Sequence, residues 1–104
     1  YGDTYLGDEV LDPLMKTIES LGVVALVHPA TPATMPAVGG TESPLPPLLL
    51  EFTFDTTRAA VNMSYRGTYV KFPRLRFQFS HAGGALPSLS WRATLAPTRS
   101  PCRP

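Results

Sequence analysis

Two histidines, His28 and His81, offer the most direct chemistry in this chain of 104 residues. Neutral imidazole is a common ligand for transition metals, and its ordinary pKa of about 6.5 also suits proton transfer. A catalytic zinc site typically needs three protein ligands and an open position for water. The two histidines alone therefore predict part of a metal or acid/base site, whose other ligands must come from elsewhere.

Both histidines directly follow a predicted strand. Residues 23–27 (VVALV) form a continuous apolar run, which is typical of a strand buried on both faces in a parallel sheet. Residues 75–80 (LRFQFS) alternate apolar and polar side chains and predict a second strand. The functional rim of parallel α/β folds lies at the carboxyl ends of the strands, and neighbouring strands lie about 4.8 Å apart. We therefore expect both imidazoles over one rim; the alternative is two unrelated polar residues where loops begin.

A helix is predicted over residues 12–22, before the first strand. Asp12 can cap its first turn, Pro13 suits the first helical position, and Gly22 is a natural left-handed terminator. The apolar residues of this segment fall at the spacing of one helical face: Leu11, Leu14, Met15, Ile18 and Leu21.

Two further helices complete the pattern. Residues 55–65 predict the second, either with Asp55 as its cap or with an earlier start near Glu51. Gly67 interrupts this helix, and residues 85–92 begin the third. The order helix, strand, helix, strand, helix predicts the α/β class, with parallel strands joined by right-handed crossovers.

The segments between these elements carry weaker signals. Residues 29–50 hold six prolines and predict a long loop that is either functional or an unconstrained linker. Gly83 and Gly84 beside His81 suit a tight turn or, on a weaker signal, a turn that cradles phosphate. Residues 94–104 hold three prolines and no periodicity, which predicts an irregular tail.

Composition restricts the classes of function. Charged residues make up 16% of the chain, the net charge is +1, and the basic side chains are scattered, so neither a nucleic-acid face nor a membrane-surface helix is expected. No apolar run approaches the roughly 18 residues that span a bilayer, and the start lacks the pattern of a signal peptide. The lone Cys102 can form no internal disulfide, which favours a cytoplasmic location. The first residue is not Met, which suggests a chain that begins inside a longer protein.

Three segments together resemble a known family. The longest is residues 71–87, KFPRLRFQFSHAGGALP, which has the form K-F-P-x-L, strand, H-x-G-G-x-x-P. Residues 26–29 (LVHP) and 55–59 (DTTRA) add a strand end and a helix start. These segments are similar to the amidohydrolase-related family, in the branch of aminocarboxymuconate-semialdehyde decarboxylase and the resorcylate and dihydroxybenzoate decarboxylases. The resemblance covers most of residues 5–93.

The resemblance implies a (β/α)8 TIM barrel, in which residues 1–93 supply the fifth and sixth strands with their helices. It implies that His28 is a metal ligand, usually of zinc, and that His81 is the acid/base group beside the metal-bound water. The implied reaction is decarboxylation of an aromatic or dienoic carboxylic acid by a carboxy-lyase. Hydrolysis by a metal-dependent enzyme of the same family is the alternative.

The departures from the family concern the metal site. The first-strand H-x-H pair and the eighth-strand Asp of the family have no counterpart here, so the site for Zn²⁺ or another divalent metal is incomplete within this chain. We therefore expect the isolated chain to be inactive, and a non-catalytic remnant stays an alternative to an enzyme segment. A homodimer of the full-length protein stays open, and a small-molecule acid is the only other partner expected.

Overall fold

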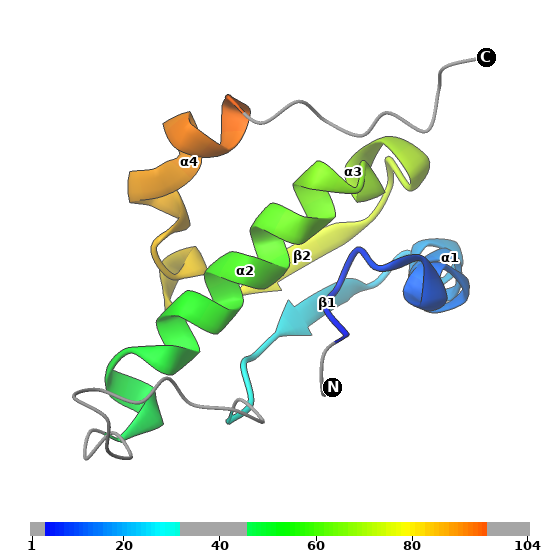
Figure 1. Cartoon of the computed structure of the whole chain (residues 1–104). Helices are drawn as coiled ribbons and strands as arrows, with labels where there is room; N and C mark the ends of the chain where they lie inside the picture. Colours follow the sequence, from blue (N-terminus) through cyan, green and yellow to red (C-terminus); the bar gives the residue numbers. More distant parts are fainter. Residues whose placement is uncertain (1–3, 32–45, 96–104) are drawn as a thin grey trace.

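Two parallel strands form the centre of the structure. The computed structural model describes residues 4–31 and 46–95 (Figure 1). β1 (Val24–Val27) pairs in parallel with β2 (Arg76–Phe79), and Val27 lies opposite Phe79 in the register. α2 (Glu51–Tyr65) lies between them in the chain and runs alongside the pair in Figure 1. The predicted α/β class and the parallel pairing are confirmed.

The remaining elements lie toward the two ends of the strands (Figure 1). Before or between the strands come η1 (Glu9–Leu11), α1 (Asp12–Leu21), η2 (Pro47–Leu49) and α3 (Thr68–Lys71), and after β2 come η3 (His81–Gly83) and α4 (Leu86–Thr94). The third predicted helix thus runs to the first residue of the predicted tail, and most of that tail and of the predicted long loop lies outside the described residues. None of the helices formed by residues 4–31 and 46–95 combines the length and apolar character needed to cross a bilayer.

α1 begins and ends where it was predicted, but without the predicted side-chain cap. Gly22 takes a left-handed conformation (φ 64°), and its N–H closes the last turn on Glu19 O at 3.2 Å. The prediction that Asp12 caps the helix is wrong, because Asp12 is its first residue and no side-chain hydrogen bond caps the turn. The Asp12 carboxylate instead accepts a hydrogen bond from Lys71 Nζ at 3.0 Å, an ion pair that ties α1 to α3.

α2 takes the earlier of its two predicted starts, at Glu51. The prediction that Asp55 is a cap is wrong, because this residue lies inside the helix and its carboxylate accepts the Tyr5 hydroxyl at 2.5 Å. That hydrogen bond, followed by burial, raises the pKa of Tyr5 above its usual value. Gly67 interrupts the helix as predicted, with a left-handed φ of 70°.

The apolar core is built mainly by α2. Its buried members are Met15 of α1 and three residues of α2: Ala59, Ala60 and Met63. Both strands alternate exposed and half-buried residues, and Val24 and Leu26 of β1 are exposed. The prediction of a first strand buried on both faces is therefore wrong for the described residues, because they cover one face of the strand pair and leave the other open.

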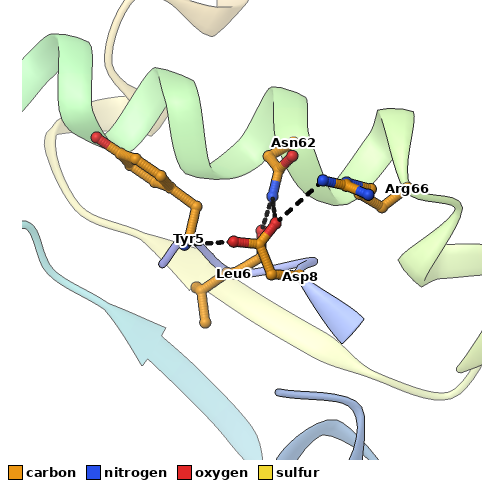
Figure 2. Close-up of polar contacts among 5 residues, drawn as sticks. All are labelled: Tyr5, Leu6, Asp8, Asn62 and Arg66. Carbon is orange, nitrogen blue, oxygen red and sulfur yellow. Dashed lines mark hydrogen bonds and ion pairs between the residues drawn. The ribbon is translucent and has the colours of Figure 1, made fainter. Parts of the chain in front are cut away.

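The carboxylate of Asp8 is one of the groups that hold the segment before η1 against α2 (Figure 2). Asp8 Oδ2 accepts the Tyr5 backbone N–H at 2.9 Å, and Asp8 Oδ1 accepts Asn62 Nδ2 at 3.0 Å. Asn62 also donates to Leu6 O at 2.9 Å, and Arg66 Nη2 lies 3.7 Å from Asp8 Oδ1. These contacts, first of all the Tyr5 N–H, hold the pKa of Asp8 below its usual range.

Replacing Asp8 by Asn should make the stability of the fold less sensitive to acid. Because the folded-state pKa of Asp8 is lowered, the stability it contributes is complete above the unfolded-state pKa of about 3.9 and is lost as pH falls through the folded-state pKa. The urea midpoint should therefore fall less steeply below about pH 4 in Asp8→Asn than in the unmodified protein. Equal slopes would show that solvent screening cancels the contribution of this carboxylate.

Candidate active site

The structure brings His28 and His81 together. Their ring centroids lie 5.4 Å apart, with an angle of 62° between the ring planes. His28 directly follows Val27, the last residue of β1, and His81 is separated from Phe79, the last residue of β2, by Ser80. The Ser80 N–H extends the ladder by bonding to Val27 O at 3.0 Å. Both residues are exposed, so a small molecule can reach them from solvent. The prediction that both imidazoles stand at the carboxyl ends of neighbouring parallel strands is confirmed.

A hydrogen bond to the backbone orients the His28 ring. His28 Nδ1 lies 2.8 Å from Pro29 O. Because a carbonyl oxygen can only accept, Nδ1 carries the proton in this arrangement, and in neutral imidazole the lone pair is then on Nε2. Histidines that bind metals almost always donate their second ring N–H in this way, which fixes the tautomer and the ring direction. This arrangement leaves the Nε2 of His28 free to accept a proton or to bind a metal.

The backbone that carries His81 is strained. His81 and Ala82 both have a φ of 53°, the left-handed region that residues other than glycine rarely adopt. Each such residue costs about 1–2 kcal/mol. Two hydrogen bonds close the turn around them, from Gly83 N–H to Ser80 O at 3.0 Å and from Gly84 N–H to His81 O at 2.8 Å. Strain that is held in place like this is concentrated at functional sites.

Gly83 and Gly84 serve the turn. Gly84 has a φ of 68°, and a Cβ atom built on it would lie 2.2 Å from Thr53 O and 2.6 Å from Thr57 Oγ1. Only glycine allows the turn to approach α2 so closely. The weaker reading of a phosphate cradle does not fit, because the N–H groups of Gly83, Gly84 and Ala85 all bond within the protein. The tight-turn reading is the one that the structure supports.

Phe52 of α2 completes a group of three rings. Its ring centroid lies 6.1 Å from that of His28, edge to face, and 6.4 Å from that of His81. Phe52 is half-buried and gives the histidine pair an apolar wall. Sequence reasoning missed this residue because one phenylalanine near the start of a helix is not distinguishable from ordinary core packing. The one feature that could have pointed to Phe52 is its position in the first turn of α2, at the end of the helix that lies near the carboxyl ends of the strands.

The metal-binding capacity of the described residues is partial. No group of three or more His, Cys, Asp or Glu side chains within residues 4–31 and 46–95 can hold a metal ion. His28 nevertheless has the side-chain type and the tautomer of a metal ligand. The ring centroid of His81 lies 5.4 Å from that of His28. The carboxylate of Asp55, a side chain that could in principle bind a metal, already accepts a hydrogen bond from Tyr5. Any further ligands must therefore come from outside the described residues.

Comparison with known proteins identifies relatives of one kind. The 6-methylsalicylic acid decarboxylase of Penicillium expansum is 31% identical over 92 residues, which is 88% of this chain and 28% of that protein. The corresponding enzyme of Aspergillus aculeatus is 30% identical over 103 residues, or 99% of this chain and 29% of that protein. The chain thus spans less than a third of the length of these relatives. No family model matches the sequence.

The fold comparison agrees with the sequence comparison. The crystal structure of an amidohydrolase II matches with a TM-score of 0.73 and 27% identity, over 88% of this chain and 30% of that one. The match covers most of this chain, so its two parallel strands and helices correspond to part of an amidohydrolase α/β fold. The chain is therefore an amidohydrolase-type α/β segment, related to the 6-methylsalicylic acid decarboxylases.

Proposed function

We propose that this chain forms part of a metal-dependent carboxy-lyase that acts on an aromatic or dienoic carboxylic acid, with His28 as a metal ligand and His81 as the proton donor. The observation that carries the proposal is the pair of imidazoles, 5.4 Å apart, at the carboxyl ends of two paired parallel strands. The names of the relatives support it, because 6-methylsalicylic acid is an aromatic carboxylic acid.

The different roles proposed for His28 and His81 follow from the different hydrogen bonds of their rings. Amidohydrolase-type enzymes generally use divalent metals; Zn²⁺ or a similar ion at His28 would hold the substrate carboxylate and polarise it. The free Nε2 of His28 is suited to this role because its Nδ1 is already bonded to Pro29 O. His81 has no such bond among those found in the described residues, and its ring can face the substrate.

The bond changes in the proposed reaction balance without a redox partner. The bond between the ring carbon and the carboxylate breaks, CO₂ leaves, and the electron pair stays on the carbon. His81 in its protonated form delivers a proton to that carbon and later regains one from water. The half-buried Phe52 beside the histidines limits access of water on one side, which favours transfer of the proton from His81.

Product analysis of the full-length protein that carries this sequence tests the reaction. We expect release of CO₂ from 6-methylsalicylic acid or a related aromatic acid, with the decarboxylated ring as the second product. A full-length protein that cleaves esters or amides but releases no CO₂ from a panel of aromatic and dienoic acids would assign the segment to a hydrolase instead. No turnover of either class would favour a non-catalytic remnant.

A cytoplasmic location belongs to the same proposal and rests on the lone Cys102.

Replacing His28 by Ala should remove bound metal from the full-length protein. Loss of a partner that merely orients a ligand costs about 10- to 100-fold in metal affinity, so loss of the ligand itself should cost at least that much. Metal content per protomer, measured by mass spectrometry after dialysis, should fall in His28→Ala and stay near the unmodified level in His81→Ala. Equal metal content in the two variants would reject the role of His28.

A further inference from the structure

We infer that Thr57 of α2 is a positioning residue for His81, holding the turn that carries this histidine against the helix. The inference rests on the proposed function of His81 and adds a residue that the sequence did not single out. It is carried by the hydrogen bonds of the Thr57 hydroxyl, by the contact of Gly84 with α2, and by the strained backbone between them.

The Thr57 hydroxyl links the turn to α2 as a hydrogen-bond acceptor. It donates to Thr53 O at 2.8 Å within the helix and accepts the backbone N–H of Ala85 at 2.8 Å. Because its single proton is committed to Thr53, a lone pair is left for Ala85. Thr57 is buried, with 6% of its surface exposed, so water does not readily replace this bond.

His81 lies between two fixed points of the chain. On one side, the Ser80 N–H bonds to Val27 O at 3.0 Å and continues the strand pairing. On the other side, Ala85 is held by Thr57, and the adjoining Gly84 touches the backbone of α2. The residues between these points include His81 and Ala82, whose left-handed backbone is unfavourable on its own. Release of one fixed point should therefore let His81 move.

The neighbouring Thr56 offers a matched control. It is also buried, with 2% of its surface exposed, and its hydroxyl donates within the helix to Phe52 O at 2.9 Å. It thus shares the residue type, the burial and the helical bond of Thr57, while the bond to Ala85 belongs to Thr57. Valine at either position removes the hydroxyl and keeps the shape of the side chain. A difference between the two variants reports the link to the turn and not the loss of a buried hydroxyl in general.

Turnover in the full-length protein is the first measurement. Thr57→Val should lower kcat for decarboxylation by about 10- to 100-fold, the cost of a small misplacement of a reacting group. KM should change by less than about threefold, because the binding of substrate to the metal is not altered. Thr57→Ser keeps the hydroxyl and should restore kcat to within about threefold of the unmodified protein, and Thr56→Val should stay in the same range. If Thr57→Val is too unstable to assay, Thr57→Ala replaces it in the same comparison.

The ring signal of His81 is the second measurement, and it does not depend on turnover. In protein labelled with ¹³C-histidine, the His81 ring cross-peak should shift or broaden in Thr57→Val and stay in place in Thr57→Ser and Thr56→Val. If Thr57→Val matches Thr56→Val in both kcat and ring signal, the inference is overturned. If the ring signal moves while substitution of His81 itself leaves turnover intact, Thr57 positions His81 as inferred and the proposed catalytic role of His81 is what fails.

Discussion

His81→Asn should lower kcat for decarboxylation by about 10²- to 10⁴-fold in the full-length protein, the usual contribution of a positioned proton donor. Asparagine is the informative replacement because it cannot donate a proton in the neutral pH range, yet it tolerates the left-handed backbone (φ 53°) that position 81 requires. The turn should therefore keep its conformation, and the loss should come from the missing imidazole alone.

Metal content and substrate affinity separate this result from a general disruption of the site. His81→Asn should retain metal, since the proposed ligand is His28 and its orienting bond runs to Pro29 O, which is not part of the turn that carries His81. Single-turnover measurement of CO₂ release reports the chemical step directly. Unchanged turnover in this variant would end the assignment of His81 as proton donor, whatever the metal content.

The juxtaposition of His28 and His81 could be predicted from the sequence because it depends on signals that are local. The first strand is marked by a continuous apolar run and the second by alternating apolar residues, and a histidine directly follows each segment. The helical segment between them implies a crossover that makes the strands parallel. The observed register, with Val27 opposite Phe79, then places the two strand ends at the same edge. The order of the elements along the chain is therefore sufficient to predict that the two histidines lie at the same edge of the sheet.

The details that could not be predicted depend on contacts between distant residues. Asp12 and Asp55 have the character of helix caps, but Lys71 and Tyr5, which lie 59 and 50 residues away in the chain, bind their carboxylates. The bond from Ala85 to Thr57 likewise spans 28 residues. A capping motif is a preference worth about 1 kcal/mol, and a tertiary ion pair or hydrogen bond of similar strength is enough to replace it.

The strained turn at His81 shows a different limit. Ala82 has no intrinsic preference for φ 53°, so the sequence does not predict a left-handed backbone at this residue. The conformation is imposed by the strand pairing on one side and by the contact with α2 on the other. A sequence can indicate that glycines follow a histidine, but the distance from Gly84 to Thr53 O becomes apparent only when α2 is placed.

Gly84→Ala should therefore destabilise the protein more than substitution of a left-handed glycine that has no close neighbours, such as Gly22. The new methyl group would lie 2.2 Å from Thr53 O, which is backbone and cannot swing away, and 2.6 Å from Thr57 Oγ1. Gly84 combines a φ of 68° with a ψ of −131°, a backbone region that is nearly closed to residues with a Cβ. Backbone strain of about 1–3 kcal/mol and overpacking of about 1–3 kcal/mol together predict a loss of about 2–6 kcal/mol.

Gly22→Ala is the reference substitution, because Gly22 has a similar φ (64° against 68°) but a left-handed ψ of 19° and no atom within 4 Å of an added Cβ. It should cost only the backbone strain, about 1–2 kcal/mol. Urea denaturation of the two variants gives the comparison, and equal losses would show that the turn can move away from α2 at no cost. That outcome would also remove the geometric basis for Thr57 as a fixed point, since a turn that yields freely to a methyl group is not held by one hydroxyl. A loss at Gly84 larger than the backbone strain of about 1–3 kcal/mol would instead mean that the position of His81 is set by how closely its turn packs against the helix.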